Sequence, residues 1–180
     1  MLSLAEQVVA LAVFPFPLDA SGPSFQSLLA EIPPGPAFDP ARTEIASLPA
    51  PEDKLAEALQ GVKAVTGVEL GKAGRAPTLK ARFVYQRAQP PFAYVPAFAA
   101  AAAPPASLQA ASAGLGALNL APDADGVVRR MPLLFRLGER IVPSLDAESL
   151  RLLANAEAIT VKCDGGGPWA GLEIAPGISS

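Results

Sequence analysis

The sequence predicts a single α/β domain with a mixed sheet, parallel in its N-terminal part and antiparallel in a hairpin part, with helices packed on the sheet. A continuous apolar run at 7–14 is typical of a parallel strand that is buried on both faces, and residues 62–70 are predicted to form the buried strand beside it. A helical pattern at 52–60 lies between them, as the crossover between two parallel strands requires. Two turn sequences within 115–142 predict the antiparallel part.

Length and composition narrow the class of protein. The 180 residues suffice for one domain with a substantial core. A net charge of −3 without a stripe of Lys and Arg excludes a nucleic-acid-binding role. The absence of His and the single cysteine, Cys163, exclude His-based catalysis, Cys-rich zinc sites and an internal disulfide, so we expect no metal and no cofactor. No apolar stretch reaches the roughly 18 residues that a membrane-spanning helix needs.

The first half of the chain is expected to contain two helical segments around a surface excursion. Apolar spacing predicts a short helix at 25–31, capped by Ser24. The proline-rich segment 32–51 is expected to run over the surface, as a plain loop or as a lid, with a helical turn or two at 41–46. The helix at 52–60 has acidic residues in its first turn, where the helix dipole favours them.

The middle of the chain offers a turn, a strand and a helix. The glycines at 71–77 predict a turn, which lacks the Gly-Lys-Ser/Thr ending of a phosphate-binding loop. A strand is predicted at 79–85 and a helix at 106–113. The aromatic residues between these elements either line a ligand pocket or, as we favour, cap the core: Phe92, Tyr94 and Phe98. A last strand is predicted at 159–162, before a linker or tail over 163–180.

Residues 114–153 have the order strand, turn, strand, turn, helix. The first turn, at 122–126, contains the Asp and Gly residues that a reversing chain favours. The residues after it carry apolar side chains on both sides of an extended chain, so a strand at 127–136 is expected to be covered on both faces. A Gly-Glu turn follows, and then Ser144 stands as the N-cap of a helix over 145–155.

Two adjacent arginines in the predicted hairpin, Arg129 and Arg130, point to opposite faces of an extended strand. A guanidinium on an apolar face needs a carboxylate or carbonyl partner. For Arg129 the candidates are Glu148 on the following helix and Asp123 or Asp125 in the turn. We favour a structural ion pair that pins the helix to the sheet, and contact of one arginine with an anionic ligand group is the alternative.

The same stretch contains candidate residues for calcium binding and for nucleophilic catalysis. Asp123 and Asp125 have the spacing of a calcium loop, but Val127, Val128 and Leu134 stand where such a loop needs an oxygen ligand, Gly and Glu. A hairpin turn is therefore the better interpretation. A nucleophilic serine is disfavoured because neither His nor a suitable Lys is near any candidate, and no pair of carboxylates stands out for hydrolysis. We expect no catalytic residue.

The order LGxLN, then PDxDGVVRRxPL, then PSLxxE resembles a known family. It is similar to the CHASE domain of the second type, the cyclase/histidine kinase-associated sensory extracellular domain of bacterial receptors. The resemblance is strong over 114–153 and fades toward the N-terminus. The matching positions are Gly114, Gly116, Asn119, Pro122, Asp123, Asp125, Gly126, Val127, Arg129, Arg130, Pro132, Pro143, Ser144, Leu145 and Glu148.

The resemblance implies that residues 1–180 are a fragment of an extracytoplasmic sensory domain on the periplasmic side of the bacterial inner membrane. The parent would be a membrane-anchored receptor with an adenylate or guanylate cyclase, histidine kinase or serine/threonine kinase output. The domain itself would be a sensor and no enzyme, and its partner a small-molecule or physical stimulus that no residue identifies. The alternative is a non-binding domain that spaces the receptor or dimerises it as a homodimer, and a hydrolase ranks lower.

The resemblance also marks a set of signature residues, with a ligand-binding or a structural role: Asn119, Asp123, Asp125, Arg129, Arg130, Ser144 and Glu148. We expect the hairpin and the helix to bring them together in one frame. In this family the first strand and the turn after it carry acids, whereas here Ala12 and Pro17 stand at two of those positions. Asp19 is the one acid that remains of this set.

Overall fold

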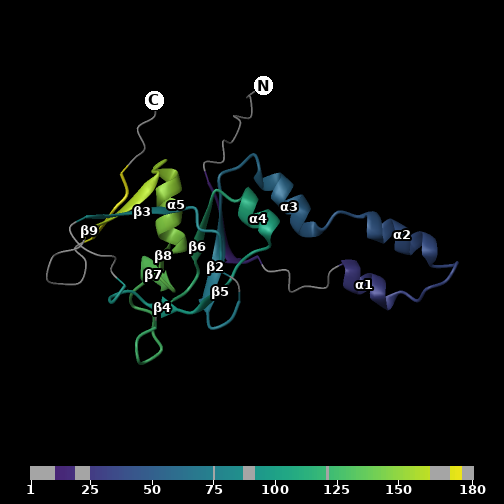
Figure 1. The fold of residues 1–180 in the computed structure, drawn as a ribbon, viewed down its shortest axis with the longest axis horizontal. Helices are drawn as coiled ribbons and strands as arrows, with labels where there is room; N and C mark the ends of the chain where they lie inside the picture. Colours follow the sequence, from purple (N-terminus) through teal and green to yellow (C-terminus); the bar gives the residue numbers. More distant parts are fainter. Residues whose placement is uncertain are drawn as a thin grey trace, which may run out of the picture.

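The computed structural model describes residues 11–18, 25–74, 76–86, 92–120, 122–162 and 171–175. It is an α/β fold with mixed sheets, which confirms the predicted class (Figure 1). The helices are α1 (Phe25–Glu31), α2 (Asp39–Ser47), α3 (Pro51–Leu59), α4 (Ala106–Ala111) and α5 (Leu145–Leu153). The strands are β1 (Ala12–Pro17), β2 (Ala64–Gly71), β3 (Arg82–Gln86), β4 (Ala97–Phe98), β5 (Ala100–Ala102), β6 (Gly114–Ala117), β7 (Leu134–Leu137), β8 (Arg140–Pro143), β9 (Ala158–Lys162) and β10 (Gly171–Glu173).

Strand β2 lies at the centre of the fold. It pairs in parallel with β1 and with β6, and its last residues pair antiparallel with β5. The other pairings lead back to it, because Ala117 of β6 forms a bridge with Ser144, the residue that follows β8, while β8 pairs with β7 and β7 pairs with β4. Since β4 runs almost directly into β5, these contacts and the chain itself connect β2, β6, β8, β7, β4 and β5 in a ring.

One apolar cluster takes side chains from every strand of this ring. Its buried members are Val68, Leu70, Ala101, Leu115, Ala117, Phe135, Leu137 and Val142, and Phe98 packs against them. Burying an aliphatic or aromatic side chain of this size stabilises a fold by roughly 1.5–3 kcal/mol. The ring is therefore a principal source of stability.

Helices α3 and α4 lie beside the β1–β2 pair (Figure 1). Their apolar side chains meet the strand in a second cluster, whose buried members are Ala56, Leu59, Ala64 and Leu108. Helix α3 begins with Pro51 and has acidic residues in its first turn, as predicted. The predicted helix at 52–60 and the strand at 62–70 are confirmed, with boundaries shifted by one or two residues, and the parallel pairing of the first two strands is confirmed as well.

A separate sheet, ordered β10-β9-β3, packs on the outside of the ring. The cluster that joins the two contains buried Val95, Leu134, Ile141 and Val161, with partly buried Phe83, Tyr85, Phe92 and Leu172. The core interpretation of the three aromatic residues thus holds for Phe92 and Phe98, whereas Tyr94 is 58% exposed. Strand β10 had no counterpart among the predicted elements.

Helices α1 and α2 form an arm that extends away from the rest of the fold (Figure 1). The two helices pack on each other, and the Arg42 guanidinium donates hydrogen bonds to the carbonyls of Leu29 (2.8 Å) and Ile32. No residue of α2 is buried. The predicted helix at 25–31 and the surface excursion after it are confirmed, and α2 is longer than the turns expected at 41–46.

The first predicted hairpin is wrong. Strand β6 pairs in parallel with β2, and residues 127–133 form no strand. Because β2 and the bridge to Ser144 already occupy β6, the chain after the turn finds no free edge to pair with. Its apolar side chains are exposed instead of covered on both faces: Val127, Val128, Met131 and Leu133. The second hairpin, β7–β8, is confirmed, with Gly138 at a φ of +59° in its turn.

Several element boundaries also differ from the predictions. Strand β1 continues through Pro17, which an edge strand tolerates, instead of ending at Phe14. Strand β3 starts at Arg82, since the chain at 76–81 is irregular. Asp19, Ser24, Cys163 and most of the predicted tail lie outside the described residues, as does the start of the first predicted strand. Within the described ranges no helix is long and apolar enough to cross a membrane.

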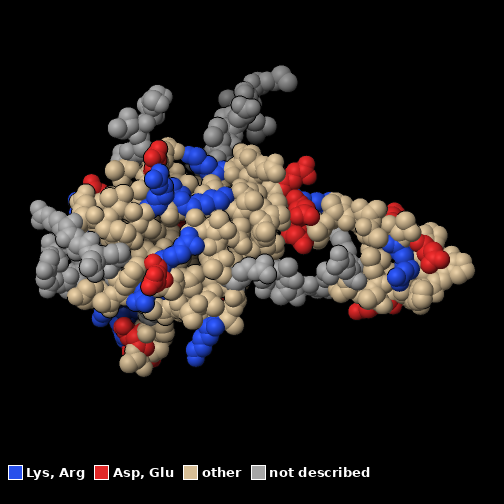
Figure 2. All heavy atoms as spheres, in the orientation of Figure 1, with Lys and Arg blue, Asp and Glu red and all other residues tan. Residues whose placement is uncertain are grey.

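Charged side chains are scattered over the molecule. On the face shown in Figure 2, acidic and basic residues alternate in small groups, and no broad basic stripe crosses this face. This face therefore presents no interface of a single sign of charge.

Candidate functional site

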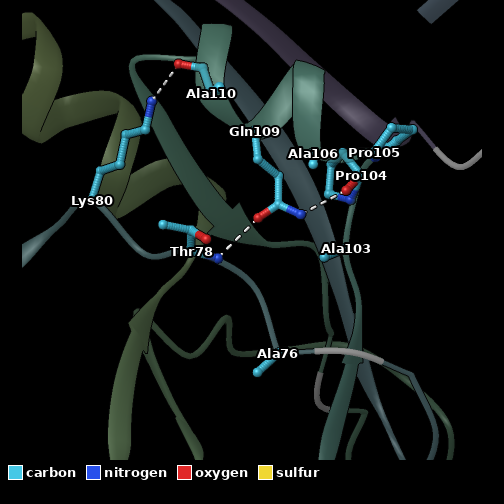
Figure 3. A pocket seen from close by; sticks show the side chains of 9 residues that line it. All are labelled: Ala76, Thr78, Lys80, Ala103, Pro104, Pro105, Ala106, Gln109 and Ala110. Carbon is cyan, nitrogen blue, oxygen red and sulfur yellow. Dashed lines mark hydrogen bonds between the residues drawn. The ribbon is translucent and has the colours of Figure 1, made fainter.

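A cavity of about 620 Å³ opens between the extended segment 76–80 and the segment 103–110, which includes α4 (Figure 3). We refer to it as the α4 cleft. Its volume lies in the range of small-molecule sites, roughly 300–1,000 Å³. The nine lining residues are Ala76, Thr78, Lys80, Ala103, Pro104, Pro105, Ala106, Gln109 and Ala110. Most of them have short side chains, which leaves the space between the two segments unfilled.

The carboxamide of Gln109 spans the cleft and joins its two walls (Figure 3). Its Oε1 accepts a hydrogen bond from the backbone amide of Thr78 at 2.9 Å, and its Nε2 donates to the carbonyl of Pro104 at 2.7 Å. Because Gln109 lies on α4, the position of this helix sets the separation of the two walls.

Lys80 stands at one end of the cleft. Its Nζ donates hydrogen bonds to the carbonyl of Ala110, at 2.9 Å, and to the carbonyl of Ser112. Both carbonyls lie at the C-terminal end of α4, where helix carbonyls lack partners and a cation is favourable. Partial burial lowers the pKa of Lys80, because the ammonium loses hydration there. It is the one charged residue among the nine that line the cleft.

The arrangement in the cleft is suited to binding. A cation, a hydroxyl and a carboxamide stand among small apolar side chains, which is the usual composition of a small-molecule site. In the part of the chain that the structure describes, no three His, Cys, Asp or Glu side chains lie close enough together to hold a metal ion.

None of the signature residues lines the cleft, and those described below have structural contacts instead. Ser144 is the N-cap of α5, as predicted, and its Oγ accepts a hydrogen bond from an amide of the first turn at 3.1 Å. The helix rests on two glycines of β6. A Cβ at Gly116 would lie 2.5 Å from the Cα of Leu145, and a Cβ at Gly114 would overlap the carboxylate of Glu148. These glycines therefore let the helix approach the strand.

Glu148 is completely buried and pairs with Arg151, one turn along α5. Arg151 donates from Nε to Oε2 at 2.8 Å and from Nη2 to Oε1 at 2.7 Å, a bidentate pair. Its Nη1 donates to the carbonyl of Ala156 at 2.8 Å. The favoured ion pair between Arg129 and Glu148 is therefore not formed, because Arg151 occupies both carboxylate oxygens.

Arg129 instead closes the turn in which it lies. It donates to Asp123 at 3.1 Å and to Asp125 at 2.9 and 2.7 Å. This contact is the main cause that lowers the pKa of Asp125, followed by the hydrogen bond from the amide of Val127, and the two carboxylates raise the pKa of Arg129. Arg130 is exposed on the same loop and bonds to no described residue.

Asn119 extends the sheet past the end of β6. Its Oδ1 accepts from the amide of Leu70 and its Nδ2 donates to the carbonyl of the same residue, both at 2.7 Å. The side chain thus replaces a strand partner for β2. Asn119, Arg129 and Glu148 each bond to a different group, so hydrogen bonds do not join them in one frame.

No motif in the sequence marks Lys80, Thr78 or Gln109 as site residues. Lys80 and Gln109 are far apart in the chain and belong to a predicted strand and a predicted helix, so no spacing rule connects them. One signal was present, since the last turn of α4 contains no basic residue of its own and its carbonyls need a partner from elsewhere.

Comparison with known families adds to this geometry. A family model described as the CHASE2 domain matches residues 7–175, nearly the whole chain. No curated protein and no solved structure gives a significant match. The match extends far beyond the stretch at 114–153 on which the resemblance depends, and it includes the segments that form the cleft. The chain therefore belongs to the CHASE2 domain family, a family of sensory extracellular domains.

Proposed function

We propose that this domain is the ligand-input domain of a bacterial transmembrane receptor and that the α4 cleft receives the ligand. The observation that carries the proposal is the cleft itself, with its bridging Gln109 and its single cation Lys80, in a chain of a sensory extracellular family. The proposed location is the periplasmic side of the inner membrane. The proposed output of the parent is an adenylate or guanylate cyclase, a histidine kinase or a serine/threonine kinase.

The contacts around the cleft supply a route for the signal. Lys80 holds the carbonyl of Ser112, which lies between the end of α4 and the start of β6. Strand β6 in turn carries α5 on Gly114 and Gly116. A ligand that favours one position of α4 would shift the population of arrangements that this chain of contacts can adopt. The signal would then be a change in the positions of α4, β6 and α5 relative to one another.

A thermal-shift screen of small molecules against the 180-residue chain tests the proposal. A compound at about 100 times its Kd stabilises the folded state by roughly 2.7 kcal/mol, which raises the melting temperature by several degrees. The variant Ala106→Trp fills the cleft and should abolish this shift. The variant Ala58→Trp, on an exposed position of α3 outside the cleft, should retain it. Equal shifts in both variants would place the binding elsewhere and contradict the proposal.

The receptor part of the proposal has its own test. The parent gene should encode membrane-crossing helices and a cyclase or kinase domain in the same chain. A topology reporter fused to the domain should report the periplasm. A parent without a membrane-crossing helix would remove the proposed location and output.

A second candidate function is a domain that dimerises the receptor and binds no ligand. The arm formed by α1 and α2 favours it, because the arm extends from the fold with exposed apolar side chains at Leu28, Phe38 and Leu48. Light scattering would show a dimer that Phe38→Ser weakens. A monomer at all concentrations would leave the arm without this role.

A further inference from the structure

We propose that the α4 cleft binds a small carboxylate with an apolar body, through Lys80 and Thr78. This inference rests on the proposed function, because it assigns a ligand class to the same cleft.

The unused polar groups of the cleft can all donate hydrogen bonds. The Lys80 ammonium has three N–H donors, of which the carbonyls of Ala110 and Ser112 take two. The Thr78 hydroxyl bonds to no other described residue. The Gln109 amide has one N–H left after its bond to Pro104, while its oxygen already accepts from the backbone. A ligand that presents acceptors therefore matches these donors.

The charge of the cleft selects among such ligands. Its lining contains one cation and no carboxylate, so an anion meets attraction and no opposing charge. The ammonium of Lys80 has also lost part of its hydration, which a bound carboxylate would replace. Hydrogen bonds between an ammonium and a carboxylate are roughly twice as strong as those between neutral groups. A neutral isostere of the ligand should therefore bind more weakly.

The walls of the cleft indicate what surrounds the anionic group. Ala103, Pro104, Pro105 and Ala106 form an apolar surface on the side of α4, and Ala76 lies opposite (Figure 3). Inorganic phosphate would leave this surface and most of the 620 Å³ unused. A carboxylate that carries an aliphatic or aromatic body would cover it and would gain from the burial of apolar area.

The test compares matched acids and amides. The 180-residue chain is titrated with hexanoate, benzoate, hexanamide, benzamide and inorganic phosphate, and the amide signals of Thr78 and Gln109 are followed by NMR. The two acids should shift these signals, and each amide should bind at least about tenfold more weakly than its acid. Phosphate should bind more weakly than either acid.

Variants assign the binding to the proposed groups. Lys80→Met should weaken the acids about tenfold and bring them to the affinity of the amides. Thr78→Val keeps the shape and should weaken the acids a few-fold, by roughly one neutral hydrogen bond. Lys72→Met, at an exposed lysine outside the cleft, should change nothing. If Lys80→Met does not fold, Thr78→Val and the ratio of acid to amide affinity in the unmodified chain still test whether the cleft binds the carboxylate group.

The outcomes separate this inference from the proposed function. Amides that bind in the cleft as tightly as the acids would overturn the carboxylate assignment and leave the cleft as the input site. Phosphate that binds as tightly as the acids would overturn the need for an apolar body. Acids that shift no signal around the cleft would overturn the carboxylate assignment, while the thermal-shift comparison of Ala106→Trp with Ala58→Trp decides whether the cleft is the input site.

Discussion

Two guanidinium–carboxylate pairs of the same chemistry lie in opposite surroundings in this domain. Arg151 and Glu148 are buried within α5, with side chains 8% and 0% exposed. Arg129 and Asp125 face solvent in the turn before β7, with side chains 52% and 54% exposed. Both pairs have bidentate contacts, and Glu148, Arg129 and Asp125 all match positions of the family pattern.

Burial decides how much each ion pair contributes to the stability of the fold. Water screens the exposed pair and competes for its hydrogen bonds, so such pairs add little to stability. The buried pair lost its hydration during folding, and both oxygens of Glu148 and all three nitrogens of Arg151 are satisfied in return. Resemblance to a family pattern therefore identifies residues whose energetic importance differs widely.

The largest expected effect comes from breaking the buried pair. Glu148→Ala leaves the Arg151 guanidinium buried with a single carbonyl partner, which should lower the free energy of unfolding by about 3–5 kcal/mol. Urea denaturation measures it. The double variant Glu148→Leu, Arg151→Met removes both charges and should be much closer to the unmodified chain. A loss below about 1 kcal/mol in the single variant would contradict the distinction drawn between buried and exposed pairs.

The next effect concerns the strand that supports the buried pair. Gly116→Ala places a Cβ 2.5 Å from the Cα of Leu145, where backbone must move, so a loss of about 1–3 kcal/mol or more is expected. The control is Gly61→Ala, where a Cβ meets nothing within 4 Å. Thermal unfolding of the two variants should differ by several degrees. Equal melting temperatures would mean that α5 can move away from β6 without cost.

A smaller effect is expected at a half-buried contact between these extremes. Asn119→Ala removes both hydrogen bonds to Leu70 and leaves its amide and carbonyl without that partner, which should cost about 1–3 kcal/mol. Amide hydrogen exchange at Leu70 should accelerate more than at Val68, which lies earlier in the same strand. Unchanged exchange at Leu70 would show that water replaces the side chain at no cost.

Local sequence patterns predicted the elements that depend on neighbouring residues. Apolar runs, proline positions and caps predicted α1, α3, β2 and the N-cap at Ser144, because each depends on neighbours in the chain. The first predicted hairpin is wrong for a non-local reason, since β6 already has β2 as a partner and a bridge to Ser144. A turn sequence shows that the chain reverses, and it does not show which strand edge is free.

The candidate site was the least predictable part. Lys80 meets α4 through backbone carbonyls, and a carbonyl leaves no mark in the sequence. The pairing of Glu148 with Arg151 was accessible in principle, because residues three apart share a helix face. Arg129 lies in the stretch that resembles the family, and Glu148 was one of its predicted partners. The other two predicted partners, Asp123 and Asp125, are the ones that it binds.

The smallest expected effect on stability comes from the exposed pair of Arg129 and Asp125, and the pH titration of Asp125 detects it best. Arg129 holds the pKa of Asp125 below its ordinary value of 3.8, so the pair contributes above that pH and its contribution is lost as the pH falls through the lowered pKa of the folded state. Arg129→Met should raise the pKa of Asp125 toward 3.8 and leave it slightly low, since the amide of Val127 still donates to it. Titration of the carboxyl carbon by NMR measures this shift.

The same variant should leave the melting temperature at pH 7 almost unchanged, because the pair is open to water. Arg130→Met, on the neighbouring exposed arginine, serves as the control and should leave the pKa of Asp125 where it is. Salt should act in the same direction as Arg129→Met, since at 1 M the screening length is about 3 Å. A large loss of stability in Arg129→Met would mean that this turn supports the fold as strongly as the buried pair does, and the contrast between the two regions would fail.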